Sequence, residues 1–229
     1  MFKFLKKIGL KLLDLFLPIE CVNCKTEGVY LCDACFEKLK INNPEDSKIL
    51  SANLKIPNLD TVWIAGNYED LLLKKLIIKY KYNFLEPLHK PLSLFLKNFW
   101  EKNLLSLSSQ KINQDNFLVI PIPLSKKRLK WRGFNQAELL VINFCSYFNY
   151  PLSLNLEKIK NRPPQVNLNE KEREKNLQSV FAFKGKRLEE KNILLIDDVA
   201  TTGATLNEAA IILKKAGAKK VEALVLAKG

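Results

Sequence analysis

The sequence predicts an α/β fold, in which helices pack on a parallel β-sheet, preceded by a small cysteine-rich module. The continuous apolar run at 117–123 and the largely apolar segments at 192–196 and 220–227 have the length and composition of buried parallel strands. Segments with apolar residues at helical spacing alternate with these runs, as expected when crossover helices connect parallel strands. Two Cys-x-x-Cys pairs between residues 21 and 35 predict the separate module.

The length and composition fit one domain plus a small module. The chain has 229 residues, of which 47% are hydrophobic and 27% charged, a balance that excludes a disordered, collagen-like or low-complexity protein. The 37 Lys and Arg residues outnumber the 24 Asp and Glu residues, so the formal net charge is +13. This excess favours a polyanionic partner: nucleic acid, an acidic membrane surface or a phosphorylated ligand. A nucleotide bias toward A and T, which enriches Lys, Asn and Ile, accounts for part of it.

The two cysteine pairs predict a structural Zn²⁺ site with four thiolate ligands. Each Cys-x-x-Cys turn places two sulfur atoms on one side of a knuckle, and two knuckles complete a tetrahedron. The predicted ligands are Cys21, Cys24, Cys32 and Cys35. Two disulfides or a redox pair are the alternatives, but no cleavable secretory signal precedes the module. Metal binding would supply much of the folding free energy of so short a segment.

Residues 1–17 predict a basic amphipathic helix, because apolar residues recur at helical spacing between four lysines. The segment is too short and too charged to cross a bilayer, and it lacks the small-residue cleavage site of a signal peptide. Two interpretations stay open: its apolar face packs on the rest of the protein, or it lies on an anionic membrane surface. The protein is therefore expected to be soluble or peripheral to a membrane.

Between the cysteine pairs and residue 116, a linker, one strand, two helices and a loop are expected. Residues 36–60 predict a linker with a short helix at its start, because Asn and Pro are frequent there. The elements expected next are a strand at 61–68, an amphipathic helix at 69–81, a helix at 92–105 and a polar loop at 106–116. The single histidine, His89, is not expected to act in a site.

The second half is expected to alternate strands and helices. The elements that join the three apolar strands are a basic loop at 124–134, a helix at 135–148, a short strand at 154–160, a polar excursion with a helical middle at 161–180, and a helix at 204–216. Gly217 is a plausible cap for the last of these helices. Cys145 falls near the end of the helix at 135–148 and is expected to be a small buried hydrophobe.

The strongest motif is the segment 192–206, in which an apolar strand is followed by two acids, a loop rich in Thr and Gly, and a helix. A loop between the carboxyl end of a parallel strand and the amino end of a helix binds anions, because free backbone N–H groups and the helix dipole favour negative charge there. Asp197 and Asp198 precede this loop and can accept hydrogen bonds from a ribose diol. The residues predicted to bind a phosphate are Ala200, Thr201, Thr202, Gly203, Ala204 and Thr205.

Other nucleotide-binding motifs do not fit this segment. A P-loop requires Lys followed by Ser or Thr after its glycines, and a dinucleotide fingerprint requires G-x-G-x-x-G; neither pattern occurs. A purely structural helix cap would need only one acidic residue, and this segment has two.

A second motif is a cluster of cations around a tryptophan. It consists of Lys126, Lys127, Arg128, Lys130 and Arg132, with Trp131 among them. Such a segment suits a pyrophosphate clamp, or contact with a nucleic-acid backbone together with stacking of bases on the Trp. A solvated run of charges is the alternative.

The segment 192–206 resembles the signature for phosphoribosyl pyrophosphate (PRPP) in type I phosphoribosyltransferases, which also joins a hydrophobic strand, two acids, a small loop and Thr-Thr-Gly. Further motifs narrow the resemblance to the ComF family. They are Pro121-Ile122-Pro123-Leu124, Arg128, Arg132-Gly133-Phe134-Asn135-Gln136, Pro164-Gln165, Arg173, Asn176 and Phe181. The four-cysteine module and the Leu71–Tyr82 segment, which ends in Lys-Tyr, are similar as well, so the resemblance covers about residues 18–228. One departure is Arg162, where many members have Thr three residues before the Gln.

This resemblance implies a parallel-sheet type I phosphoribosyltransferase fold with an N-terminal zinc knuckle and a small hood. The expected parts are the helix at 1–17, the zinc module at 18–40 and the domain at 61–229, with hood segments at 61–105 and 161–183. It also implies that PRPP, or a related ribose 5-phosphate, binds with Mg²⁺ at Asp197 and Asp198. The residues implied near the pyrophosphate are Arg128, Arg132, Gly133, Asn135 and Gln136.

The resemblance further implies a role in natural transformation, in which the protein handles incoming single-stranded DNA in the cytoplasm. DNA-uptake machinery proteins and the inner membrane, contacted peripherally through residues 1–17, are implied partners. The candidate DNA contacts are Lys126, Lys127, Lys130 and Trp131. Two alternatives stay open: an active phosphoribosyltransferase that acts on a small nitrogen nucleophile, and a non-catalytic PRPP sensor. The sequence identifies no acceptor substrate.

Overall fold

The computed structural model describes residues 19–52, 54, 56–106, 116–159 and 180–229. Three predicted segments lie wholly or mostly outside these residues: the helix at 1–17, the polar loop at 106–116 and the excursion at 161–180. The excursion contains most of the hood segment expected at 161–183, together with Arg162 and Gln165.

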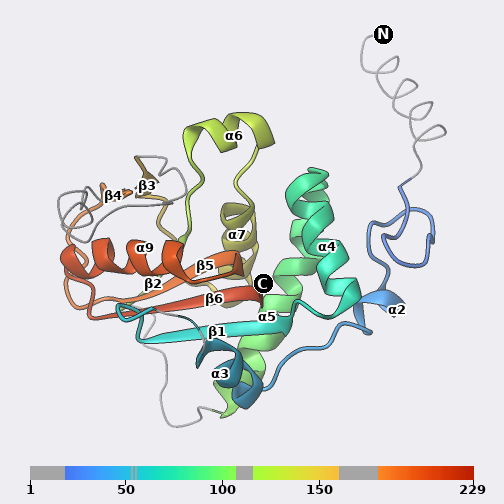
Figure 1. The fold of residues 1–229 in the computed structure, drawn as a ribbon, viewed down its shortest axis with the longest axis horizontal. Coiled ribbons are helices and arrows are strands. Elements are labelled where there is room, and N and C mark those ends of the chain that lie inside the picture. The colour runs from blue at the N-terminus through green and yellow to red at the C-terminus, as the bar shows by residue number, and fades with distance from the viewer. Residues whose placement is uncertain (1–18, 53, 55, 107–115, 160–179) are drawn as a thin grey trace, which may run out of the picture.

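A four-stranded parallel sheet forms the centre of the fold (Figure 1). Its strands are β1 (Thr61–Asn67), β2 (Phe117–Pro121), β5 (Asn192–Ala200) and β6 (Lys220–Lys228), in the order β1-β6-β5-β2. All three pairings are parallel, which confirms the predicted fold class. Because β5 lies between β6 and β2, the residues at its carboxyl end emerge in the middle of the sheet edge. A separate antiparallel pair consists of β3 (Leu156–Lys158) and β4 (Phe181–Phe183).

Of the helices that the structure describes, those at 71–82, 89–106, 136–148 and 204–215 lie close to their predicted positions. In chain order the described helices are α2 (Asp33–Phe36), α3 (Pro44–Ala52), α4 (Leu71–Tyr82), the 3₁₀ turn η1 (Glu86–Leu88), α5 (His89–Ser106), α6 (Lys126–Arg132), α7 (Gln136–Phe148) and α9 (Ala204–Lys215). Asp70 caps α4, since its side chain accepts hydrogen bonds from the N–H groups of Leu72 and Leu73. No helix in the described ranges has both the length and the apolar character needed to span a bilayer.

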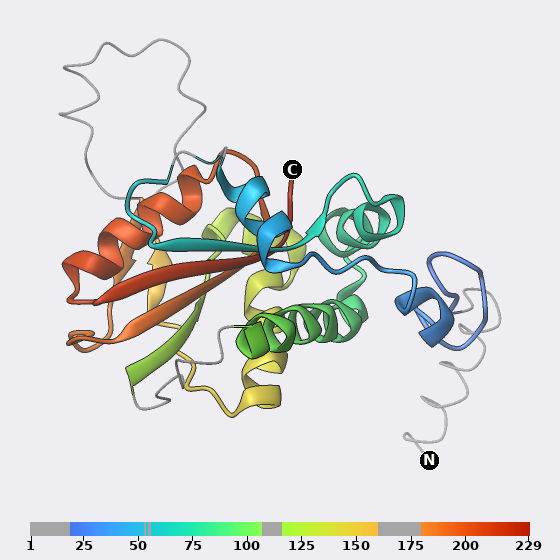
Figure 2. The same cartoon turned by 90° about the horizontal axis from the view of Figure 1, so that it is seen from below.

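Helices cover both faces of the parallel sheet, and the strands bury side chains on each (Figure 2). On β5, Leu194 and Ile196 join an apolar cluster with α4, α5 and α7, whereas Ile193 and Leu195 join a second cluster with α9. Burial on both faces is the reason why this strand is apolar at consecutive positions. Val22 of the cysteine-rich module is part of the first cluster, so the module packs on the domain.

Residues 36–60 are not the linker that the sequence predicted, because their middle forms α3 and packs on the sheet. The buried Ser47 hydroxyl accepts a hydrogen bond from the Ile64 N–H of β1 at 2.8 Å. Asn42 contributes two further bonds: its side chain donates to the Ile64 carbonyl, and its backbone N–H donates to the Ala65 carbonyl, each at 2.9 Å. This segment therefore satisfies backbone groups of an edge strand that would otherwise be open to another chain. Asn residues in this segment therefore cap α3 and bond to β1, and they do not mark a linker.

Ser47→Ala is expected to lower the free energy of unfolding by about 1–3 kcal/mol, because it leaves the buried Ile64 N–H without a partner. Ser51→Ala is the matched control on the same helix, since the Ser51 hydroxyl bonds only locally, to the Lys48 carbonyl. Urea unfolding measures both. If the two variants lose the same stability, α3 does not support β1 in this way.

The predicted basic loop at 124–134 is wrong, because residues 126–132 form helix α6. Ser125 caps the helix by accepting a bond from the Arg128 N–H, and Gly133 ends it in the left-handed conformation, with φ of 84°. Both are ordinary boundary signals of a helix. The sequence prediction missed these two boundary residues because the segment between them consists mostly of cations.

Candidate functional site

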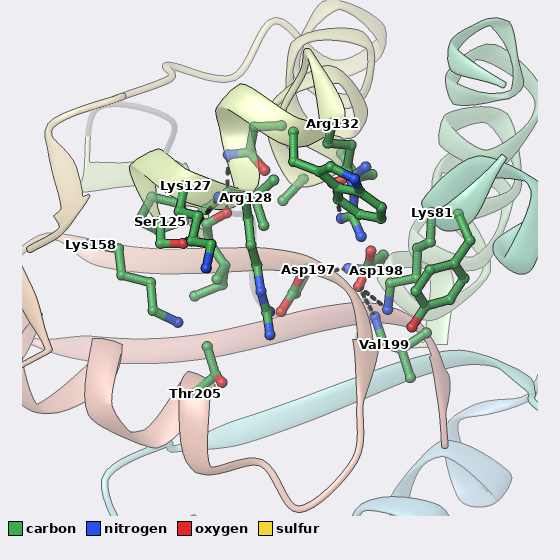
Figure 3. A pocket seen from close by; sticks show the side chains of 18 of the residues that line it. Lys81, Ser125, Lys127, Arg128, Arg132, Lys158, Asp197, Asp198, Val199 and Thr205 are labelled. Atoms are coloured by element: carbon green, nitrogen blue, oxygen red, sulfur yellow. Dashed lines mark hydrogen bonds and ion pairs between the residues drawn. The ribbon is translucent and has the colours of Figure 1, made fainter. Parts of the chain in front are cut away.

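A pocket of about 850 Å³ lies beyond the carboxyl ends of β2 and β5 (Figure 3). Its walls come from the end of α4, the β2–α6 connection, α6, the start of α7, β3, and the β5–α9 connection. Ligands in open parallel sheets bind at this edge, where loops follow the strands. Among the residues that the structure describes, cations dominate the lining, with Lys81, Lys127, Arg128, Arg132 and Lys158 against two acids. The pocket therefore suits an anionic ligand.

The two acids belong to β5 itself, which runs four residues beyond the predicted end of the strand at 196. Asp198 is buried, and its Oδ1 accepts a bond from the Val199 N–H and pairs with Lys81 Nζ, each at 2.7 Å. Asp197 is half-buried, and its Oδ1 accepts the Asp198 N–H at 2.8 Å. Burial, reinforced by the neighbouring Asp198, raises the pKa of Asp197 well above its ordinary value.

This raised pKa predicts that Asp197→Asn stabilises the protein at neutral pH. A carboxyl group whose pKa is higher in the folded state costs stability as the pH rises from its unfolded pKa through its folded pKa. The gain from Asn is therefore expected at pH 7 and should vanish at about pH 3, where both forms are neutral. Urea unfolding at the two pH values measures it, with the exposed Glu190→Gln as control. An equal effect at both pH values would contradict the raised pKa.

The predicted phosphate loop connects β5 to α9 and contains a glycine that the structure requires. Gly203 has φ of 80°, and a Cβ there would overlap with Ile56 Cγ2. Its position immediately before a 12-residue helix exposes free N–H groups of α9. Of the six predicted phosphate-binding residues, Thr201 and Thr205 line the pocket. The Thr202 hydroxyl accepts a hydrogen bond from the Ala204 N–H at 3.4 Å. Ala200 is buried and is the last residue of β5.

Opposite this loop, α6 and the start of α7 form the second wall. Four of the five residues implied near a pyrophosphate line it: Arg128, Arg132, Asn135 and Gln136. Gly133 does not, since it is the exposed cap of α6. In Figure 3, Arg128 extends across the pocket toward Asp197 and Thr205. Of the candidate DNA contacts, Lys127 and Trp131 line the pocket, and Lys126 and Lys130 are exposed elsewhere on the same helix.

The second wall holds buried polar atoms that have no partner within the described chain. Arg132 donates through Nη1 to Gln136 Oε1, and Asn135 donates through Nδ2 to the Ile122 carbonyl at 3.1 Å. These bonds orient both carboxamides and leave Arg132 Nε, Asn135 Oδ1 and Gln136 Nε2 unsatisfied. Buried unpaired polar atoms are costly and are typical of sites that a ligand completes.

Lys81, Tyr82 and Lys158 line the pocket but are absent from the site candidates that the sequence identified. The Lys-Tyr pair at the end of α4 is part of the family resemblance, but no sequence pattern assigned it to a site. Lys158 lies on β3 with its Nζ 5.3 Å from the centre of the Phe181 ring, and burial lowers its pKa. Nothing in the sequence distinguishes Lys158 from a surface lysine, because β4, which covers it, follows the long excursion.

The four cysteines of the module converge on one point, as their spacing predicted. Their four Sγ atoms lie within 4.8 Å of one another, and Cys24 and Cys32 are 3.5 Å apart. A tetrahedral site with Zn–S bonds of about 2.3 Å has sulfur atoms about 3.8 Å apart, so the cluster fits Zn²⁺. The Thr26 hydroxyl, 3.1 Å from Cys24 Sγ, is the main cause that lowers the pKa of this thiol to about 6, which favours the thiolate that binds metal. Cys145, by contrast, is buried on α7, as expected.

Strand β5 of the parallel sheet brings two acids and a loop rich in Thr and Gly to one pocket, and a family model of the phosphoribosyl transferase domain matches residues 148–229. The fold is thus of the phosphoribosyltransferase type, with a cysteine module consistent with a zinc knuckle.

Curated relatives narrow this class. Competence protein ComFC of Bacillus subtilis is 35% identical over 175 residues, which are 72% of this chain and 69% of that protein. Competence protein F of Haemophilus influenzae is 35% identical, over 48% of this chain and 49% of that protein. Competence protein ComFC of Streptococcus pneumoniae is 37% identical, over 53% of this chain and 52% of that protein. The chain belongs to the ComF family of competence proteins.

Proposed function

We propose that the protein binds PRPP together with Mg²⁺ in the pocket at the end of β5 and acts in natural transformation by handling single-stranded DNA. The observation that carries the proposal is the pairing of two acids with a cation-rich wall across one pocket. A ribose needs acceptors for its hydroxyl groups, and a pyrophosphate needs cations. The pocket offers both at opposite walls.

The proposal gives each part of the pocket a role. Asp197 and Asp198 accept hydrogen bonds from the ribose diol, and the Thr201–Thr205 loop binds the 5′-phosphate through N–H groups of α9. Arg128 and Arg132 neutralise the pyrophosphate. Unpaired Gln136 Nε2 is a further donor for it.

Carboxylate oxygens are the protein ligands that Mg²⁺ prefers, so Asp197 and Asp198 fit this ion. Lys81 already pairs with Asp198, which leaves Asp197 as the more available ligand. When bound, Mg²⁺ would neutralise negative charge on the pyrophosphate. The chain itself orients the sugar between β5 and α6.

The DNA part of the proposal is supported by α6 and by the names of the relatives. Lys126, Lys127 and Lys130 are exposed on one short helix, where they can contact successive phosphates of a strand. Several relatives are named competence proteins, and a protein of Escherichia coli strain K12, 29% identical over 45% of this chain and 46% of its own length, is named DNA utilization protein.

Calorimetric titration with PRPP, with and without Mg²⁺, tests the proposed ligand. We expect saturable binding at one site per chain that tightens when Mg²⁺ is present. Absence of binding under both conditions would overturn the proposal. Pyrophosphate release then separates the two classes of function: release indicates a transferase, and binding without release indicates a PRPP sensor.

A further inference from the structure

Three exposed aromatic side chains gather at the mouth of the pocket. Trp131 of α6 is 60% exposed, and Tyr82 and Phe84, at and just beyond the end of α4, are 58% and 39% exposed. We call these three residues the aromatic rim. Large aromatic side chains gain most of their stabilising free energy from burial. Two exposed rings in contact, with a third joined to them through Arg132, therefore indicate a surface that a ligand covers.

Direct contacts hold the rim together across two distant parts of the chain. The Phe84 and Trp131 rings meet edge to face, with centroids 4.9 Å apart and planes at 83°. The Arg132 guanidinium carbon lies 5.9 Å from the centroids of both the Tyr82 and the Trp131 rings. An edge-to-face contact hides less ring surface than a stacked one, which agrees with the high exposure of Trp131.

The backbone at Phe84 adds a second observation. Its φ is 54°, in the left-handed region that is costly for a residue with a bulky side chain. The chain nevertheless holds Phe there, with its ring exposed and against Trp131. A buried packing role would not require this exposure, whereas a role in presenting a ring at the pocket mouth does.

The surroundings of the rim identify the ligand chemistry. Lys126, Lys127 and Lys130 are exposed on the same helix as Trp131, so the rim adjoins positive charge. Exposed rings beside cations suit an unpaired base on a charged backbone, because every base has a face that stacks and every linkage a phosphate that pairs. An uncharged lipid or an apolar protein surface would match the rings but not the adjoining lysines.

We propose that an unpaired base of single-stranded DNA stacks on the aromatic rim while its flanking phosphates contact the α6 lysines. This inference rests on the DNA-handling part of the proposed function and adds the residues and the contact that perform it. Tyr82 and Trp131 also line the pocket, so the stacked base lies beside the proposed PRPP site. The single-stranded DNA and PRPP would then reach the protein through the same opening of the pocket.

Tryptophan fluorescence of the full-length protein can test the stacking directly. Trp63 and Trp100 pack edge to face on each other, with centroids 6.0 Å apart, away from the rim, which leaves Trp131 as the exposed reporter. The probes are an oligothymidylate and an abasic oligonucleotide of the same length, which has the same backbone charge but no bases. We expect the oligothymidylate to quench fluorescence and to bind about 10-fold more tightly than the abasic strand.

Variants assign the effect to the rim. Trp131→Leu and Phe84→Leu keep apolar volume but remove the rings, so each is expected to reduce the preference for the strand with bases several-fold while leaving abasic binding unchanged. Fluorescence anisotropy of a labelled strand measures these affinities, and it does not need Trp131 as the reporter. Tyr147→Leu, an exposed aromatic on α7 outside the pocket, is the control and is expected to change neither affinity.

The outcomes of these experiments separate the two proposals. Equal affinity for both strands, or an unchanged preference in the Trp131 and Phe84 variants, would overturn base stacking while leaving charge-driven DNA binding intact. If neither strand binds, the DNA part of the proposed function fails as well, and base stacking fails with it.

Discussion

Asp197→Asn combined with Asp198→Asn is expected to abolish PRPP binding, with affinity reduced at least 100-fold. The double variant removes both negative charges that face the cation-rich wall, and with them the charged acceptors of the ribose diol and the proposed Mg²⁺ ligands. It also leaves the half-buried Lys81 ammonium without its partner at 2.7 Å, so that Lys81 is free to attract the pyrophosphate away from its proposed position. Calorimetric titration with PRPP and Mg²⁺ measures the loss.

Two controls make this result interpretable. Glu190→Gln changes an exposed carboxylate outside the pocket and is expected to leave binding unchanged. The double variant itself should remain folded, since Asn retains the side-chain oxygens that accept the Asp198 and Val199 N–H groups. Undiminished affinity in a folded double variant would contradict the assignment of the diol site to β5.

Loss of the metal is expected to unfold the cysteine module and to destabilise the domain beside it. Cys21 and Cys35 are buried within the module, whose short α2 has little core of its own. Metal binding to four thiolates contributes on the order of 10 kcal/mol in small zinc modules, so its loss leaves the module without most of its stabilisation. Because Val22 and Leu39 pack in the same cluster as α5 and α7, the loss extends to the domain.

Metal analysis and limited proteolysis check this prediction. We expect about one zinc per chain, and Cys21→Ser should lose the metal and be cleaved rapidly within residues 19–40. Cys145→Ala is the matched control, because this buried cysteine lies outside the cluster and should keep its zinc. A Cys21→Ser protein that resists protease as the parent does would contradict a metal-stabilised module.

The sequence predicted the sheet well because its strands are buried on both faces. Residues 193–196 and 223–227 are apolar at consecutive positions, a pattern that half-exposed strands and surface helices rarely show. The strand at 192–196 was nevertheless too short, because Asp197 and Asp198 are polar residues within β5. Polar site residues at the end of a strand interrupt its apolar pattern, so the predicted strand ends too early.

Elements whose stability comes from caps and distant contacts were harder to predict. Helix α6 depends on Ser125 and Gly133 at its two ends, and five of its seven residues are charged, so no apolar periodicity reveals it. Helix α3 is secured by the bond between Ser47 and Ile64, which joins residues that no local pattern relates.

Site residues that belong to recognisable local motifs were predicted, and those that tertiary packing delivers were not. The acids and the Thr-Gly loop are adjacent in sequence, and the four cysteines have the spacing of a metal knuckle. Lys81, Tyr82 and Lys158 reach the pocket from α4 and β3, and only the folded chain brings them to β5. The rim contact between Phe84 and Trp131 is of the same kind.

Amide hydrogen exchange of the wild-type protein, with and without PRPP and Mg²⁺, tests the central claim most directly, because it reports where the ligand binds. We expect slower exchange in two segments, Asp197–Thr205 at the β5–α9 connection and 126–136 along α6 and the start of α7, which face each other across the pocket. Exchange in the cysteine module at 19–40 should not change. Protection confined to other parts of the chain, or no protection at saturating PRPP, would contradict the claim that this pocket binds PRPP.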